Sequence, residues 1–252
     1  MDANLRLEHE CADAWPALID RPLGEWRMRA SDGFTGRANS TLAAGDPGMP
    51  VEDALDEAVR FAVDHGITPS AQVVMGTETE EEIEKVDWVV NIEHAAGAEV
   101  SVLTGRLDGL TWPPVSGVSV DPTPSAQWWQ LAAGTAEPTR AQRQVLGTGR
   151  SIGFGSAWRD GQVVAVVRGA LVGDLLHIAS LSVMPEYRRQ GIAAGLLGSL
   201  AEWAVERGAT RCAAQVAVHN TPALQLWSVL GCAEHHRYRY WKPAPRESFS
   251  GL

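Results

Sequence analysis

Residues 181–195 read LSVMPEYRRQGIAAG and join a predicted strand to a predicted helix through a short turn. The strand prediction rests on the alternating, β-branched residues 177–183 before the turn. The helix prediction rests on Ile192 and Leu196, which fall on one helical face after it. Gly191 and the free N–H groups of a helix start allow an anion to approach the backbone closely. This stretch therefore predicts a phosphate-binding turn.

A second stretch, residues 220–232, reads NTPALQLWSVLGC. Together the two stretches resemble the GNAT N-acyltransferase superfamily. Residues 188–193 match the Arg-x-x-Gly-x-Ala loop that binds the coenzyme A pyrophosphate, and residues 220–232 are similar to the later segment Asn-x-x-Ala-x-x-Leu-Tyr-x-x-x-Gly-Phe. The resemblance covers roughly the second half of the chain. It implies a mixed α/β sheet of the GNAT fold, and the order of predicted elements in the first half is compatible with a degenerate GNAT-like unit in tandem.

These motif residues also have structural interpretations. An Arg-rich turn before a helix is often a solvated cap. Asn220 before Thr221-Pro222 is a good helix start, and Gly231 is a good left-handed C-terminal cap.

The length of 252 residues permits two domains. Prolines cluster between residues 107 and 124, where they limit helix and sheet. We therefore predict a substrate-shaping N-terminal domain over residues 1–112, a linker over 113–126 and a catalytic domain over 127–252.

Composition narrows the partners and the compartment. A net charge of -10 and a pI near 5.2 disfavour nucleic acid and anionic membranes as partners. Three cysteines are too few for a disulfide framework or a zinc site. No signal peptide or membrane-spanning run is evident, so a cytoplasmic location is expected. The oligomeric state is not predicted.

The resemblance implies transfer of an acetyl group from acetyl-CoA, without a metal, to a primary amine held on the other side of the sheet. The residues that it assigns to the cofactor are Leu181, Ser182 and Val183 along the strand, Arg188, Arg189, Gln190, Gly191, Ile192 and Ala193 in the turn, and Asn220 and Trp227 in the later segment.

Position along the strand selects His177 as the candidate general base. It lies two, four and six residues before Ala179, Leu181 and Val183, so strand alternation places these side chains on one face. Histone-acetylating relatives have a glutamate base at the corresponding position. The alternative is a packed histidine at a strand start.

The candidate acid departs from the family pattern. Trp227 stands where relatives have a tyrosine, and an indole N–H does not protonate a thiolate. Tyr238 or Tyr240 could replace that tyrosine, or the thiolate could leave unaided. Packing in the core is the alternative for Trp227.

Two further questions stay open. Residues 33–39, GFTGRAN, form either a strand–turn segment or a segment whose Arg37 reaches an acidic group of the substrate.

The leading function is acetylation of a small-molecule amine. The alternatives are a non-catalytic acyl-CoA sensor and a protein-modifying acetyltransferase.

Overall fold

The computed structural model describes residues 2–95, 97–110, 112–113 and 115–245. The first half contains α1 (Ala3–Ala14), β1 (Ile19–Leu23), β2 (Trp26–Ala30), the 3-10 helix η1 (Arg37–Asn39), β3 (Thr41–Ala43), α2 (Val51–Asp64), β4 (Ala71–Val74), α3 (Glu78–Ile83), β5 (Trp88–Val90), β6 (Glu99–Arg106) and the 3-10 helix η2 (Leu107–Gly109). The second half contains β7 (Val118–Asp121), α4 (Ala126–Ala133), α5 (Arg140–Gly147), β8 (Ile152–Arg159), β9 (Gln162–Val172), β10 (Leu175–Val183), the 3-10 helix η3 (Pro185–Tyr187), α6 (Ile192–Val205), β11 (Arg211–Ala217), α7 (Thr221–Leu230) and β12 (Ala233–Pro243).

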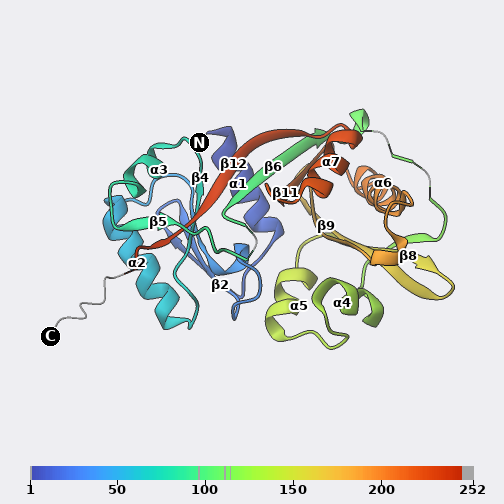
Figure 1. The fold of residues 1–252 in the computed structure, drawn as a ribbon, viewed down its shortest axis with the longest axis horizontal. Coiled ribbons are helices and arrows are strands. Elements are labelled where there is room, and N and C mark those ends of the chain that lie inside the picture. The colour runs from blue at the N-terminus through green and yellow to red at the C-terminus, as the bar shows by residue number, and fades with distance from the viewer. Residues whose placement is uncertain (1, 96, 111, 114, 246–252) are drawn as a thin grey trace.

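The twelve strands among the described residues form one sheet across both halves (Figure 1). Its order is β1-β2-β3-β4-β12-β6-β11-β10-β9-β8-β7, and β5 pairs with β12. The pairs β3–β4 and β10–β11 are parallel, and the other pairs are antiparallel. The predicted mixed α/β architecture is thereby confirmed.

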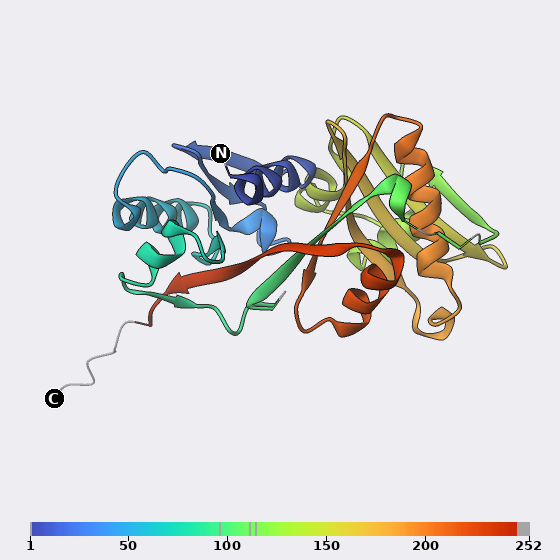
Figure 2. The ribbon, with the colours of Figure 1, turned by 90° about the horizontal axis from the view of Figure 1, so that it is seen from above.

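The two halves exchange strands in the middle of this sheet. Strand β6 of the first half pairs with β11 on one side and β12 on the other. Strand β12 continues into the first half, where it pairs with β4 and β5. Figure 2 shows β6 in green and β12 in red crossing between the halves. The predicted linker contains β7, which pairs with β8, and the domain limits stay a prediction.

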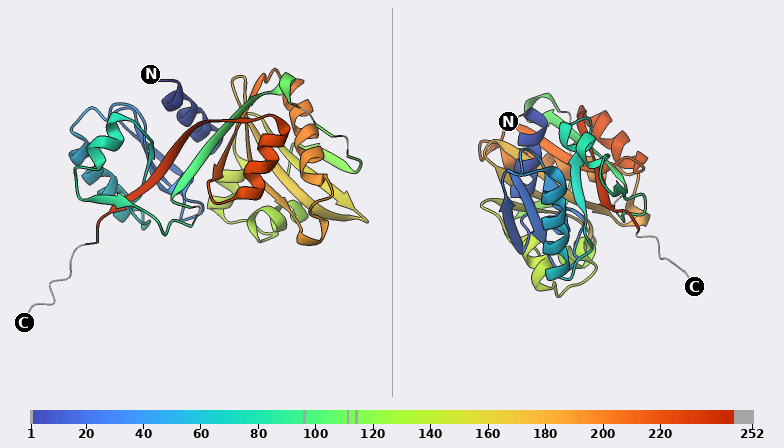
Figure 3. Two further views of the ribbon diagram at one scale, coloured as in Figure 1. Left: turned by 45° about the horizontal axis from the view of Figure 1, so that its top comes forward. Right: turned by 90° about the vertical axis from the view of Figure 1, so that its left-hand side faces the viewer.

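Helices cover both faces of the second half's sheet (Figure 3). On one face, α6 and α7 bury Leu200 and Trp227 against Ile178 of β10. On the other face, α4 and α5 bury Trp128 and Leu146 in a second cluster. In the first half, α2 packs on Trp26 and Trp241. No helix in the described part of the chain is long and apolar enough to cross a membrane.

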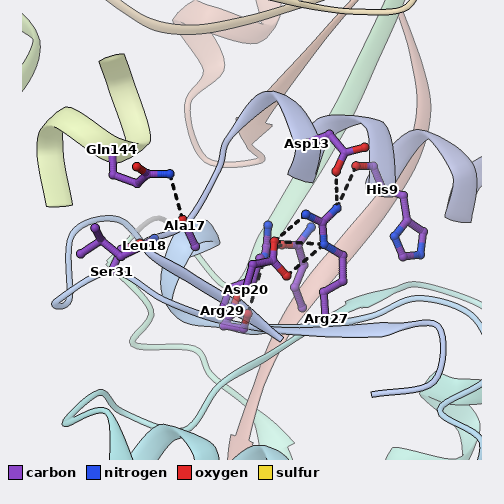
Figure 4. Close-up of polar contacts among 11 residues, drawn as sticks. His9, Asp13, Ala17, Leu18, Asp20, Arg27, Arg29, Ser31 and Gln144 are labelled. Atoms are coloured by element: carbon purple, nitrogen blue, oxygen red, sulfur yellow. Dashed lines mark hydrogen bonds and ion pairs between the residues drawn. The ribbon is translucent and has the colours of Figure 1, made fainter. Parts of the chain in front are cut away.

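None of the sequence patterns above predicts α1, yet this helix lies across the junction of the halves. Its Leu7 and Cys11 pack with residues of β6, β10, β11 and β12. At its C-terminal end, Arg27 Nη1 donates to Asp13 Oδ1 at 2.6 Å (Figure 4). Beyond the helix, Gln144 Nε2 of α5 donates to the Ala17 carbonyl at 3.2 Å. The first helix is thus tied to both halves.

Arg168 of β9 is a buried polar tie between these elements. Its side chain donates to the carbonyl oxygens of Leu146 at 2.7 Å, Ala14 at 2.9 Å and Thr148 at 3.2 Å. Burial lowers the pKa of Arg168 to about 9, which leaves the guanidinium charged at neutral pH.

We expect Arg168→Ala to lower the free energy of unfolding by about 3 kcal/mol, because two buried carbonyl groups and one partly buried carbonyl group lose their donor at about 1 kcal/mol each. Denaturant unfolding measures this change. Arg150→Ala, at an exposed arginine, is the control and should stay within about 0.5 kcal/mol of the unmodified protein. Equal losses in both variants would contradict the assigned role of Arg168.

Candidate active site

The predicted phosphate-binding turn lies at the start of α6. The chain leaves β10, passes through η3 and enters the helix at Gly191, the N-cap, whose φ is 76°. A Cβ at Gly191 would meet no other atom within 4 Å, so the backbone here is open to a ligand. The first N–H groups of a helix have no acceptor within the helix and attract an anion. The local geometry fits a pyrophosphate.

Cationic side chains surround this turn. Arg188 Nε donates to the Val183 carbonyl at 3.0 Å, which folds the turn back on the strand. Gln190 Nε2 donates to the Glu186 carbonyl at 3.2 Å. Both Arg188 and Arg189 are exposed, and neither forms an ion pair with another residue in the described ranges. Their charges are available to an anionic ligand.

Strands β10 and β11 part just before the turn. Their register ends at Ile178↔Ala214, after which β11 continues beside β6 alone. The β10 edge that carries Leu181, Ser182 and Val183 therefore borders a gap in the ladder. Backbone groups on such an edge are free to bind an extended ligand.

A β-bulge interrupts the alternation of side chains along β10. Between Ala179 and Ser182 the register with β9 shifts by one residue, and Ser180 has a φ of 54°. This β-bulge reverses the alternation of side chains. His177 and Ala179 share the face of α1 and α4 with Ser182, whereas Leu181 and Val183 pack on the opposite face with α6. The predicted common face of His177, Leu181 and Val183 is wrong.

His177 lies inside the protein, with no exposed surface. Its ring is 6.1 Å from that of Trp15. Neither ring nitrogen has a hydrogen bond of good geometry within the described residues, although the nearby Gln215 side chain opposes part of the pKa shift. Burial, and then the guanidinium groups of Arg37 and Arg168, hold the pKa of His177 well below its usual value. The imidazole is therefore neutral.

The candidate acids lie elsewhere in the sheet. Tyr238 and Tyr240 are buried on β12 with hydroxyl oxygens 3.5 Å apart, and Tyr240 stacks on His94 at 3.6 Å. Burial raises the pKa of each phenol. Strand β12 is three positions from β10, about 14 Å at normal strand spacing. The structure does not gather these tyrosines and His177 around one point.

The remaining predicted cofactor residues belong to α7. Asn220 is the N-cap and accepts from the Ala223 N–H at 3.3 Å, while Gly231 supplies the left-handed C-cap. Trp227 is buried in the cluster beneath α6. Asn220 therefore caps a helix and Trp227 packs in the core, as their structural interpretations predict. Contact with a cofactor stays a prediction for both residues.

A buried polar network joins the halves on the α1 face, and none of the motifs above includes its centre, Glu8. Gln72 donates to Glu8 Oε2, Gln215 Nε2 donates to the same oxygen at 3.1 Å, and His236 Nε2 lies 3.0 Å from Glu8 Oε1. Arg37 Nη1 donates to Gln215 Oε1 at 2.5 Å. The local signals for this helix are the N-cap Asp2 and the spacing of Leu7 and Cys11. Neither signal marks Glu8, because its partners come from distant segments.

A separate cleft of about 810 Å³ lies where β10 and β11 begin, whereas the turn follows the end of β10. Part of its charged wall is paired: Arg211 contacts Glu10 at 2.9 Å and Asp174 at 3.0 Å. Its position separates it from the cofactor turn.

The mixed sheet, the parted strands and the open, cationic helix start agree with a GNAT N-acetyltransferase. The chain belongs to the family described as "Probable histone acetyltransferase Rv0428c C-terminal", whose model matches residues 3–241. It is therefore a member of the acetyl-CoA-dependent GNAT enzymes, which confirms the resemblance and the enzyme class.

Individual relatives support the same class. The "Uncharacterized N-acetyltransferase YobR" of Bacillus subtilis is 24% identical over 94% of this chain and 98% of its own length. An "Aminoglycoside N(6')-acetyltransferase type 1" of Acinetobacter baumannii is 33% identical over 30% of this chain and 52% of its own length.

Solved structures show the fold over the whole chain. A GCN5-related N-acetyltransferase from Kribbella flavida has a TM-score of 0.66 at 15% identity and covers 97% of both chains. A tandem GNAT protein from the clavulanic acid biosynthesis pathway has a TM-score of 0.58 at 18% identity, covering 75% of this chain and 68% of its own. The predicted GNAT fold is confirmed over the whole chain, and a tandem GNAT protein matches most of it.

The neutral state of His177 makes stability depend on pH. In the unfolded chain a histidine has a pKa of about 6.5, and the folded value is lower, so the unfolded state binds more protons between the two values. Stability should fall as pH is lowered through about 6.5, by at most about 1.4 kcal/mol per pH unit from this group.

Denaturant unfolding between pH 5 and 8 measures how the free energy of unfolding depends on pH. We expect this dependence to be smaller in His177→Gln than in the unmodified protein. His219→Gln, which removes an exposed histidine, is the control. The same pH dependence in His177→Gln and the unmodified protein would refute the assignment.

Proposed function

We propose that this protein transfers the acetyl group of acetyl-CoA to the primary amine of a small molecule. The observation that carries the proposal is the turn at residues 188–193, which lies at a helix start beside the gap between β10 and β11. Phosphates bound at the turn would leave the thioester end of the cofactor to follow the β10 edge.

The cofactor residues in this proposal divide by chemistry. Arg188 and Arg189 offset phosphate charge, and the N–H groups of Gln190, Gly191, Ile192 and Ala193 donate to phosphate oxygens. The backbone of residues 181–183 holds the pantetheine and the acetyl carbonyl. When bound, acetyl-CoA supplies an activated acyl group. The chain orients the amine and accepts its proton.

Proton transfer by side chains stays part of the proposal. His177 is neutral and faces the side of the sheet opposite α6, where an amine would enter. Its ring is buried, 6.1 Å from that of Trp15 and near Gln215, so a proton would reach it only when neighbouring side chains move. Tyr238 and Tyr240 have raised pKa values and stay protonated at neutral pH, but they lie on a distant strand.

The first half favours a small acceptor. Helix α1 and residues 31–39 cover the face of β10 and β11 that carries His177 and Gln215. The Acinetobacter baumannii relative is named for a small-molecule amine substrate, whereas the family description names a histone. A covered face suits a small molecule better than a protein segment. A non-catalytic sensor would bind acetyl-CoA equally well. Thiol release distinguishes the two, because only an enzyme releases coenzyme A when an amine is added.

Gly191→Ala is expected to weaken acetyl-CoA binding at least tenfold, about 1.4 kcal/mol, because a Cβ occupies the space that a phosphate needs. Calorimetric titration measures the affinity. Gly208→Ala, at the other end of α6, has a similar left-handed φ of 90° and open surroundings, so it matches the backbone strain without touching the turn.

The outcomes separate the hypotheses. Loss of affinity in Gly191→Ala alone, with amine-dependent thiol release by the unmodified protein, supports the transferase. Equal affinity in both variants would rule out the proposed phosphate site. Binding with no thiol release from any amine would favour the sensor.

A further inference from the structure

Positive charge exceeds negative charge around Trp15, where the two halves meet. Three arginines lie in this region, Arg29, Arg37 and Arg168. The carboxylates that act on them are Glu8 and Asp20, and Asp20 is itself paired with Arg27. None of the three forms an ion pair with a carboxylate within the described ranges. Charges inside proteins are normally paired, so an excess of this kind needs an explanation.

Two of the three arginines are explained by the fold. Arg168 is fully buried and donates to three backbone carbonyl groups. Arg29 is buried as well and donates to Gln72 Oε1 at 3.0 Å and to the Ser40 carbonyl at 3.4 Å. Both side chains hold backbone and side-chain oxygens in place and have no access to a ligand.

Arg37 differs because it is partly exposed and sparsely bonded. Its guanidinium donates one hydrogen bond, to Gln215, and lies 4.6 Å from the centre of the Trp15 ring. A guanidinium has five N–H donors, so most of its capacity remains. Its charge reaches deep groups nonetheless, since it lowers the pKa of His177.

The position of Arg37 relates it to the acceptor. Gln215 comes one residue after Ala214, the last residue of β11 that pairs with β10, so it borders the gap between the strands. Phe34, three residues before Arg37, packs in one cluster with Trp15 and Ala179. The segment of residues 33–39 therefore places a cation beside the gap, on the face opposite α6.

The shape of the region limits how an anion can approach. The crevice between Glu8, Arg29 and Arg37 has no space for a water molecule. A ligand must meet Arg37 from its exposed side. A carboxylate fits a guanidinium with two parallel hydrogen bonds, whereas a polycationic amine would be repelled by the surrounding positive charge.

We infer that the acceptor of this enzyme is an amine that also carries a carboxylate, as an amino acid does, and that Arg37 binds that carboxylate. The inference rests on the proposed acetyl transfer and specifies its substrate class. It assigns Arg37 a role in selecting and orienting the acceptor, separate from the cofactor turn.

The test compares matched acceptors and matched variants. The probes are a panel of amino acids, the corresponding amino acid amides, which lack the carboxylate, and the aminoglycoside kanamycin. Thiol release gives kcat/KM for each, and calorimetry on the coenzyme A-saturated protein gives acceptor binding without turnover. The variants are Arg37→Gln, Arg37→Lys and the control Arg143→Gln at an exposed site.

We expect at least one amino acid to be preferred over its amide, and Arg37→Gln to lower its kcat/KM about 100-fold. Arg37→Lys should recover part of this loss, and the amide should lose much less than the amino acid in either variant, since only the change in the electrostatics of His177 affects both acceptors. Acetyl-CoA binding should be the same in all variants, which also verifies folding.

Equal use of acid and amide, equal loss of both in Arg37→Gln, or preference for kanamycin would overturn the inference while leaving the transferase intact. Failure to bind acetyl-CoA would instead overturn the proposed function, and the inference with it.

Discussion

Backbone pairing of β6 between β11 and β12 is the constraint on which the rest of the structure depends. A strand from the first half fills the centre of the second half's sheet, and β12 returns to complete the first. The halves consequently have a fixed relation. That relation places α1 over the junction and residues 33–39 beside the gap between β10 and β11.

The same relation determines the electrostatics of the site. On the face of the sheet that α6 covers, the gap leads to an open, cationic helix start that suits phosphates. The other face holds a neutral His177 near Arg37 and Arg168. The proposed phosphate site and the proposed acceptor site thus lie on opposite faces of one sheet, and each face has its own positive charge.

The open, cationic helix start that we propose as the cofactor site could be predicted from the sequence because its parts are contiguous. Residues 188–193 carry the glycine, the cations and the helix start within six positions, so no tertiary information is needed. The predicted strand at residues 177–183 and the helix that became α6 follow for the same reason, since their hydrophobic period is local.

Side-chain placement beyond the turn could not be predicted in this way. The bulge at Ser180 reverses the alternation of β10, and alternation was the basis for grouping His177 with Leu181 and Val183. The network of Glu8, Gln72 and Gln215 joins segments up to 207 positions apart. Its formation requires the strand exchange, which leaves no signal in any single segment.

The most direct test of the account is to produce residues 1–112 and 113–252 as separate chains and to follow unfolding of each alone and of the mixture. Without β6, residues 113–252 should show no cooperative transition, and mixing should restore one together with acetyl-CoA binding. Cooperative unfolding of residues 113–252 alone, with the acetyl-CoA affinity of the whole chain, would contradict the central role of the exchanged strand.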